Sequence, residues 1–268
     1  MILPLTPDEF SLKKTFECGQ CFRFDPLDEY SYIGIAGDSP LILTQYGDHI
    51  KLSCGNEEYK RFWRCYFDMD FDYEAVRVSL ARDDFMRNAA DFGQGIRILR
   101  QSQWEALCSF IISQCNNIPR IKGIISRLCE LYGEPREVEG HRLFSFPTPD
   151  RIAGLSTEKL VFLRCGYRAS YIISAAEAVC GGLLDKAEQL DTDSLRDRLT
   201  NLRGVGNKVA DCVLLFGFHR FESFPADIWI KRAVAEHGID PAVFGVHAGL
   251  AQQYIYYYTR ENAMKRKI

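Results

Sequence analysis

A short glycine turn that leads into a helix places the strongest constraint on how this chain folds. Residues 202–208 read Leu-Arg-Gly-Val-Gly-Asn-Lys, and an apolar stretch with helical character follows them. Because glycine lacks a Cβ, the two glycines permit positive φ angles and a close approach of the backbone to another surface. Backbone amides at the N-terminal end of a helix bind anions well. The turn therefore predicts an interhelical hairpin in which Gly204, Val205 and Gly206 contact a phosphate.

Lys208 and Asp227 flank the helix that this turn opens. Lys208 falls in the first helical turn, where the positive end of the helix disfavours an ammonium, and only the neutral amine is a nucleophile. Asp227 follows Phe-Pro-Ala and precedes a second helix that begins at Ile228. A plainer interpretation makes these residues a solvated lysine and a helix N-cap. A P-loop is excluded, because its lysine precedes Ser or Thr, whereas Val209 follows Lys208. The residues alone leave both this plainer interpretation and a catalytic one open.

Length and composition describe a globular chain. Its 268 residues, 47% of them apolar, suffice for one large domain or for two to three packed ones. It has no apolar stretch of roughly 18 to 20 residues, and its first residues lack the features of a signal peptide. We expect no membrane association and an intracellular protein, cytoplasmic at the nucleoid in a prokaryote or nuclear in a eukaryote. The net charge of −3 argues mildly against nucleic-acid binding but does not decide what a local site binds.

The ten cysteines are expected to be reduced thiols, because no secretory signal accompanies them. Cys18 and Cys21 form a C-x-x-C pair, which fits redox chemistry or half of a zinc site. A second pair at zinc-ligand spacing does not follow. We therefore expect neither a metal nor a cofactor.

The hydrophobic periodicity changes along the chain. From about residue 22 to residue 54 it alternates with a period of two, and Gly37 and Gly47 mark turns, which predicts an antiparallel sheet. After about Tyr73 apolar residues recur every three to four positions, as in helices. The sequence thus predicts an α+β fold. An N-terminal mixed α/β domain with an antiparallel β-sheet (1–95) precedes a mostly helical, two-lobed body (96–268) that contains the glycine hairpin.

The hairpin, Lys208 and Asp227 together resemble the helix-hairpin-helix, Gly/Pro-Asp signature of base-excision DNA glycosylases that use a catalytic lysine. Further segments resemble those of the Ogg-type 8-oxoguanine DNA glycosylase/AP lyases, and with the hairpin they span nearly the whole chain. These segments are 18–24, 99–120, 165–171 and 248–256. No cysteine follows Cys212, so the C-terminal four-cysteine iron–sulfur cluster of the endonuclease III and adenine-glycosylase branches is absent.

The resemblance implies a pocket for a flipped base. Gly19 stands where a family carbonyl accepts the N7 proton that 8-oxoguanine carries and guanine lacks. Gln252 and Tyr256 share one helix face, so that an amide reads the Watson–Crick edge while a ring stacks on the base. The family usually has phenylalanine in place of Tyr256. Cys212, one turn after Lys208, matches the opposite wall. Without the resemblance these residues could be a turn glycine, core packing and a buried thiol.

The resemblance also implies residues that fill the gap left in the base stack by the flipped base and that contact the orphaned cytosine opposite it. These are Asn116, Asn117, Arg120, Tyr167 and Arg168. Arg120 and Arg168 would donate to the cytosine, with Tyr167 wedged beside it. Cys115 replaces a third family asparagine and is a poor hydrogen-bonding partner. Asn116 or Asn117 could also cap the helix that Pro119 opens.

The expected activity is that of a bifunctional DNA glycosylase/AP lyase on double-stranded DNA containing 8-oxoguanine, preferably opposite cytosine. Asp227 would stabilise a cation-like sugar, and Lys208 would form a Schiff base that permits β-elimination. Trp229, where relatives often have histidine, would contact the DNA backbone or the core. We expect a monomer. The alternatives are a related glycosylase for another oxidised or alkylated base and a DNA-binding protein without catalysis.

Overall fold

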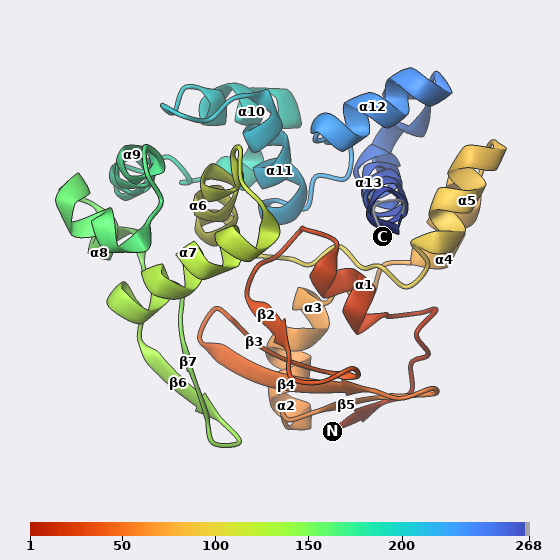
Figure 1. Cartoon of the computed structure of the whole chain (residues 1–268), viewed down its shortest axis with the longest axis horizontal. Coiled ribbons are helices and arrows are strands. Elements are labelled where there is room, and N and C mark those ends of the chain that lie inside the picture. The colour runs from red at the N-terminus through yellow and green to blue at the C-terminus, as the bar shows by residue number, and fades with distance from the viewer. Residues whose placement is uncertain (266–268) are drawn as a thin grey trace.

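A five-stranded antiparallel sheet forms the N-terminal part of the computed structural model, which describes residues 1–265 (Figure 1). Its strands lie in the order β1-β5-β4-β3-β2. Their bounds are Ile2–Leu3 (β1), Phe24–Pro26 (β2), Ser31–Ala36 (β3), Ser39–Gln45 (β4) and Ile50–Leu52 (β5). The β3–β4 hairpin turns at Gly37, whose φ is +56°, as the sequence predicts.

Short helices cover this sheet and close a first hydrophobic core. They are α1 (Leu12–Glu17), α2 (Asn56–Glu58), the π-helical turn η1 (Tyr59–Trp63) and α3 (Arg64–Tyr66). Aromatic rings fill the space between helices and sheet. Phe16 stacks on Phe24 with a centroid distance of 4.1 Å, and Trp63 stacks on Phe67 at 5.3 Å. Because this core holds α1 on the sheet, it also sets where the chain continues after Glu17.

The rest of the chain is mostly helical and surrounds a second, larger core. The α-helices are α4 (Tyr73–Leu80), α5 (Asp84–Phe92), α6 (Gln103–Ser113), α7 (Ile118–Tyr132), α8 (Pro149–Ile152), α9 (Arg168–Cys180), α10 (Thr192–Thr200), α11 (Asn207–Gly217), α12 (Ile228–His237) and α13 (Ala248–Lys265). The 3₁₀ helices are η2 (Thr157–Leu163), η3 (Ala187–Gln189) and η4 (Pro241–His247). The predicted α+β class, with a sheet followed by a helical body, is confirmed.

The helices fall into two groups that meet above α1. In one group α6 packs against α9 and α11, and in the other α13 packs against α5 and α12. Figure 1 shows the first group on the left, the second on the right, and α1 below the space between them. This arrangement brings the N-terminal end of α11, the start of α12 and one face of α13 toward one another.

Some elements differ from the prediction. The sequence does not predict strand β1, because two residues carry no periodic pattern. It also does not predict a second hairpin, which β6 (Pro135–Val138) forms with β7 (His141–Phe144). Its charged side chains hide the alternation, and its turn at Glu139 and Gly140 takes positive φ at both positions. Within residues 1–265, no helix has the length and apolarity to cross a membrane.

Candidate active site

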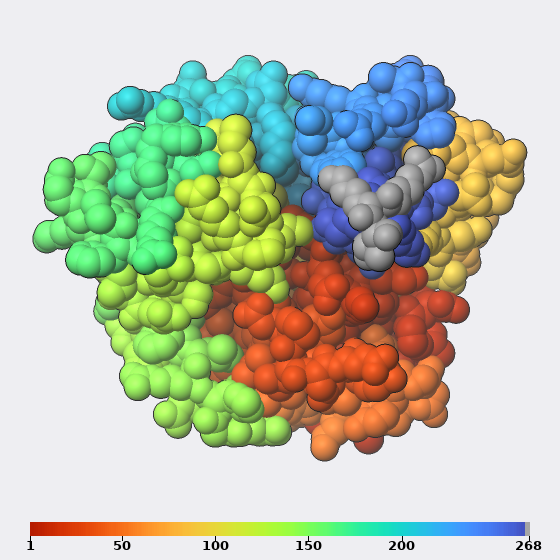
Figure 2. All heavy atoms as spheres, in the orientation of Figure 1, coloured from red at the N-terminus to blue at the C-terminus, as the bar shows by residue number. Residues whose placement is uncertain are grey.

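A pocket of about 830 Å³ opens where the two helix groups meet α1. Figure 2 shows segments that border it on one face of the molecule: the turn between α6 and α7, α12 and α13, with α1 below. Most of the predicted site residues line this single pocket. They are Gly19, Asn116, Asn117, Gly206, Lys208, Cys212, Asp227, Gln252 and Tyr256. Residues up to 237 positions apart in the sequence thus share one cavity.

Lys208 and Cys212 project into the pocket from α11. The helix begins at Asn207, so Lys208 lies in its first turn as predicted, half-buried, with Nζ 5.6 Å from the centroid of the Phe110 ring. Cys212 is buried one turn later. Burial raises the pKa of the Cys212 thiol to about 11, and Lys208 nearby opposes that rise. At neutral pH Cys212 is therefore a neutral, apolar wall rather than a competing nucleophile.

Asp227 has two functions in the structure. It is the N-cap of α12, and its Oδ1 accepts a hydrogen bond of 2.9 Å from the Ile230 amide. The plainer interpretation of this residue as a helix cap is therefore correct. The same side chain also lines the pocket with Lys208. The cap bond uses only Oδ1, so capping and catalysis are compatible.

Gly19 lies directly against the ring of Tyr256. It follows α1 with φ at +79°, and a Cβ on it would come within 3.2 Å of Tyr256 Oη and 3.3 Å of Cε1. Both the backbone angle and the close approach favour glycine here. The N-terminal segment and α13 thus form two adjoining walls of the pocket.

Gln252 contributes a buried amide to the same cavity. Its side chain is almost fully buried, and its Oε1 has no hydrogen-bond partner among the residues that the structure describes. A buried acceptor without a partner costs about 1 to 3 kcal/mol. An amide oxygen left in this state at the wall of a pocket indicates that a ligand supplies the missing donor.

The glycine hairpin joins α10 to α11. Gly204 has φ at +86°, and a Cβ there would lie 2.3 Å from the Tyr171 ring. Gly206 has φ at −97° and open space around it, so of the two glycines only Gly204 uses a positive φ. As the N-cap, Gly206 takes an extended conformation instead.

The structure also corrects the part that Val205 takes in phosphate binding. Its side chain is buried, and its amide already donates to the Leu202 carbonyl over 3.0 Å. Val205 therefore anchors the turn rather than offering a free amide. The amide of Ala210 makes the first helical bond, to the Gly206 carbonyl at 3.0 Å. The amides of Asn207, Lys208 and Val209 precede it, so they remain available to an anion.

The Asn-rich turn lies between α6 and α7. Asn117 caps α7, because its Oδ1 accepts a bond of 3.0 Å from the Arg120 amide. Asn116 Nδ2 donates to the Ile112 carbonyl at the end of α6 over 3.1 Å. These two side chains thus shape the turn. Cys115 is exposed with φ at +46°, a conformation that side chains other than asparagine and aspartate rarely adopt.

Arg168 differs most from its predicted contact with an orphaned base. It is 3% exposed, and its guanidinium donates to three backbone carbonyls. Nε bonds the Gln114 carbonyl at 3.0 Å, Nη2 the Cys115 carbonyl at 3.3 Å and Nη1 the Cys165 carbonyl at 3.2 Å. These bonds occupy the fork of the guanidinium. Arg168 therefore holds the α6–α7 turn against α9 in this structure.

Arg120 and Tyr167 remain exposed beside that turn. The Tyr167 side chain is 54% exposed, with the Arg168 Cζ 4.5 Å from its ring centroid. Arg120 reaches only one described acceptor, the Arg164 carbonyl at 3.5 Å from its Nη2. These two side chains can meet a partner without breaking strong internal bonds.

The pocket also contains residues that the sequence reasoning did not assign to it. Phe110, Gln253 and Arg260 line it, and Trp229 does so in a half-buried position. Arg260 could have been found by extending the helical stripe from Gln252 through Tyr256 by one more turn. Gln253 and Phe110 carry no motif that distinguishes them from core residues.

No third His, Cys, Asp or Glu joins the C-x-x-C pair in a metal-binding group within residues 1–265. Cys18 and Cys21 are buried free thiols. Burial raises the pKa of Cys18 to about 11 and that of Cys21 further. Over residues 1–265, no group of three or more His, Cys, Asp or Glu residues could hold a metal ion.

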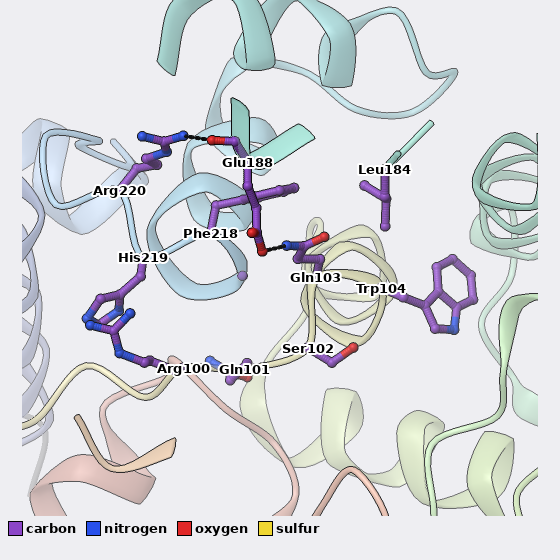
Figure 3. Close-up of a pocket in the computed structure, with 11 residues that line it drawn as sticks. Arg100, Gln101, Ser102, Gln103, Trp104, Leu184, Glu188, Phe218, His219 and Arg220 are labelled. Atoms are coloured by element: carbon purple, nitrogen blue, oxygen red, sulfur yellow. Dashed lines mark hydrogen bonds between the residues drawn. The ribbon is translucent and has the colours of Figure 1, made fainter. Parts of the chain in front are cut away.

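Another pocket, of about 710 Å³, lies at the start of α6 beside the end of α11 (Figure 3). None of the predicted site residues lines it. Its polar side chains bond to groups within it: Gln103 Nε2 donates to Glu188 Oε1 at 2.9 Å, and Arg220 Nη2 donates to the Glu188 carbonyl at 3.0 Å. Because it lacks the predicted catalytic residues, it is a weaker candidate for the reactive site.

Two protein-family models together match most of the chain. Residues 2–107 match the model of the 8-oxoguanine DNA glycosylase N-terminal domain, and residues 108–243 match that of the HhH-GPD superfamily base excision DNA repair proteins. The N-glycosylase/DNA lyase of Saccharomyces cerevisiae is 33% identical over 263 residues, which cover 86% of this chain and 69% of that protein.

Two solved structures superpose closely on the chain. MBOgg1 in complex with a low-affinity DNA ligand has a TM-score of 0.92 and 40% identity, covering 98% of this chain and 96% of that one. The Clostridium acetobutylicum 8-oxoguanine glycosylase/lyase, in complex with double-stranded DNA containing cytosine opposite 8-oxoG, has a TM-score of 0.91 and 35% identity, covering 95% and 93%. The chain therefore belongs to the Ogg-type 8-oxoguanine DNA glycosylase/lyases of the HhH-GPD superfamily.

Proposed function

We propose that this protein removes 8-oxoguanine from duplex DNA, preferably opposite cytosine, and then nicks the strand as an AP lyase. One observation carries the proposal: Lys208 and Asp227 share a single pocket with the base-contacting candidates Gly19, Cys212, Gln252 and Tyr256. Family membership and the DNA-bound relatives support it. The partner is double-stranded DNA, and its lesion strand supplies the flipped base.

The chemistry uses Asp227 and Lys208 in sequence. As the bond between C1′ and the base breaks, the bonding electrons leave with the base and positive charge develops on the sugar. The Asp227 carboxylate, fixed by the Ile230 amide, stabilises that charge. The Lys208 amine bonds to C1′ as one of its protons passes to the departing base. Opening of the sugar ring then moves the other proton to O4′ and leaves an imine. Loss of a proton from C2′ then expels the 3′ phosphate and nicks the strand.

Recognition of the lesion depends on groups that already surround the cavity. The Gly19 carbonyl accepts the N7 proton of 8-oxoguanine, and the Gln252 amide reads the Watson–Crick edge. Tyr256 stacks on one face of the base and Cys212 borders the other. A hydrogen bond contributes about 0.5 to 1.5 kcal/mol, whereas a buried carbonyl that faces a lone pair on guanine costs about 1 to 3 kcal/mol. The penalty for binding guanine thus contributes more to the discrimination between the two bases than the hydrogen bond to 8-oxoguanine does.

The opposite strand meets the exposed residues of the α6–α7 turn and the start of α9. Arg120 donates to the orphaned cytosine and Tyr167 wedges beside it, while Cys115 lies at the stack-filling position. Arg168, Asn116 and Asn117 shape this surface rather than reading the base. The amides at the start of α11, beside Gly206, bind a backbone phosphate. The monomeric state, the cellular compartment and the domain boundary at 95/96 stay predictions.

A panel of duplexes tests the proposal. Each duplex carries 8-oxoguanine, guanine or an alkylated purine opposite each of the four bases, and release of the base is measured under single turnover. The expected result is release of 8-oxoguanine, fastest opposite cytosine. Release of the alkylated purine alone would assign the protein to another lesion. Binding without any release would leave a DNA-binding protein without catalysis.

A further inference from the structure

The C-terminal end of α1 is held by two side chains of α13. Gln253 Nε2 donates to the Cys18 carbonyl over 2.7 Å, and Arg260 Nη2 donates to the Glu17 carbonyl over 2.7 Å. Both side chains are buried. The carbonyls of these two successive residues are therefore occupied by α13. The next carbonyl in the chain belongs to Gly19.

The same stretch of α13 also supplies two pocket walls. Gln252 and Tyr256 line the cavity, and the Arg260 Cζ lies 5.4 Å from the centroid of the Tyr256 ring. Arg260 is kept in place by Glu261, whose Oε1 accepts from Arg260 Nη2 at 2.7 Å. One helix thus connects the stacking ring to the backbone segment that carries Gly19.

A buried glutamine holds the other side of Gly19. Gln20 is 0% exposed, and its Nε2 donates to the Arg97 carbonyl over 2.7 Å. Its Oε1 accepts from the Leu99 amide at 2.9 Å. Gly19 therefore lies between two anchored residues, although its own φ of +79° belongs to a region that glycine samples freely.

We infer that Gln253 and Arg260 are positioning residues that place the Gly19 carbonyl and thereby set the preference for 8-oxoguanine over guanine. This inference rests on the proposed function. The two bases differ at N7 by one proton, and a hydrogen bond weakens steeply with distance and angle. A carbonyl that accepts a hydrogen bond from N7 must be held within about 0.5 Å of its working position. The contacts from α13 supply that restraint.

The expected effect is selective. Gln253→Met keeps the bulk of the side chain and removes the donor to Cys18. Excision of 8-oxoguanine is expected to fall about 10-fold, the equivalent of one well-made hydrogen bond. Nicking of a preformed abasic site requires Lys208 but no base, so it falls much less. Arg260→Lys, which keeps the charge but loses the planar fork, gives a smaller change in the same direction.

A matched control comes from Gln45, which holds the opposite end of α1. Its Nε2 donates to the Phe10 carbonyl at 3.1 Å, and its Oε1 accepts from the Leu12 amide at 2.9 Å. Gln45→Met removes comparable hydrogen bonds to α1 without changing a residue that lines the pocket. It is expected to lower the melting temperature while leaving the ratio of excision to nicking at its wild-type value.

The test measures single-turnover excision, abasic nicking and thermal unfolding for the full-length wild type and the three variants. A ratio of excision to nicking that falls in Gln253→Met and Arg260→Lys but not in Gln45→Met supports the inference. Equal losses of both activities, or an unchanged ratio in folded Gln253→Met, overturn it. Failure of the wild type to excise 8-oxoguanine would instead overturn the proposed function, so the two failures are distinct.

Discussion

Gly19 and Tyr256 lie so close together that a Cβ on Gly19 would approach the tyrosine hydroxyl to 3.2 Å. The family usually has phenylalanine at the tyrosine position, so this chain adds a hydroxyl next to the glycine that we propose reads the lesion. Burial raises the pKa of Tyr256, and Arg260 opposes that rise. The hydroxyl therefore stays protonated at neutral pH. The contact makes Gly19 sensitive to the smallest possible enlargement.

Gly19→Ala is predicted to reduce excision of 8-oxoguanine at least 10-fold. The left-handed backbone disfavours alanine by about 1 kcal/mol, and the added methyl group displaces the Tyr256 ring. Nicking of an abasic site falls less, because no base enters the pocket. Gly47→Ala is the control, since nothing lies within 4 Å of a Cβ there. Equal excision by wild type and Gly19→Ala would contradict this placement of the pocket.

Substitutions at Asp227 separate its helix cap from its charge. Asn and Asp cap helices about equally well, so Asp227→Asn should keep the free energy of unfolding within about 0.5 kcal/mol of wild type. Its excision rate should nevertheless fall roughly 100-fold, because the carboxylate no longer stabilises the sugar cation. Asp227→Ala loses both functions and about 1 kcal/mol of stability. Urea unfolding and single-turnover excision measure the two effects. If the excision rate instead changes only with the free energy of unfolding, Asp227 acts only as a helix cap.

Cys115→Asn is predicted to be neutral or stabilising by a few tenths of a kcal/mol, because asparagine tolerates the φ of +46° better than cysteine does. The added amide also offers hydrogen bonds at the stack-filling position. The preference for cytosine over adenine opposite the lesion should therefore increase severalfold. Excision rates on the two duplexes check this, and an unchanged preference would show that this position does not affect the choice of opposite base.

The Cys212 thiol predicts a pH dependence of stability. Its pKa is raised by burial to about 11, against an ordinary value of 9.0. The buried neutral thiol contributes fully to the free energy of unfolding below about pH 9. This contribution is lost as the pH rises through 11, because the thiol of the unfolded state releases its proton first. Wild type should therefore lose about 1 kcal/mol more than Cys212→Ala between pH 8 and pH 10. Urea unfolding at both pH values measures this difference, and parallel losses would contradict it.

The sequence predicts the fold and the pocket where local pattern and spacing suffice. Alternation identifies β3 and β4, and the residues around Lys208 specify the hairpin and the start of α11. Gln252 and Tyr256 share one face of α13 because they are four residues apart. Because segments spread over the chain resemble one family, the sequence also predicts that distant residues such as Gly19 belong to the same site.

The remaining features depend on tertiary contacts that no local pattern carries. Arg168 matches the family's motif, yet its guanidinium already donates to the carbonyls of Gln114, Cys115 and Cys165. Gln253 looks like an ordinary helix residue until its partner, 235 positions away, is known. Both depend on how α9 and α13 pack against other elements, which periodicity does not specify.

Lys208 is the proposed nucleophile that attacks C1′ of the lesion nucleotide. Borohydride trapping on a duplex with 8-oxoguanine opposite cytosine tests it most directly, with wild type beside Lys208→Gln. A covalent protein–DNA adduct is expected with wild type and none with the variant. Base release by wild type without an adduct would contradict it, because water would then be the nucleophile.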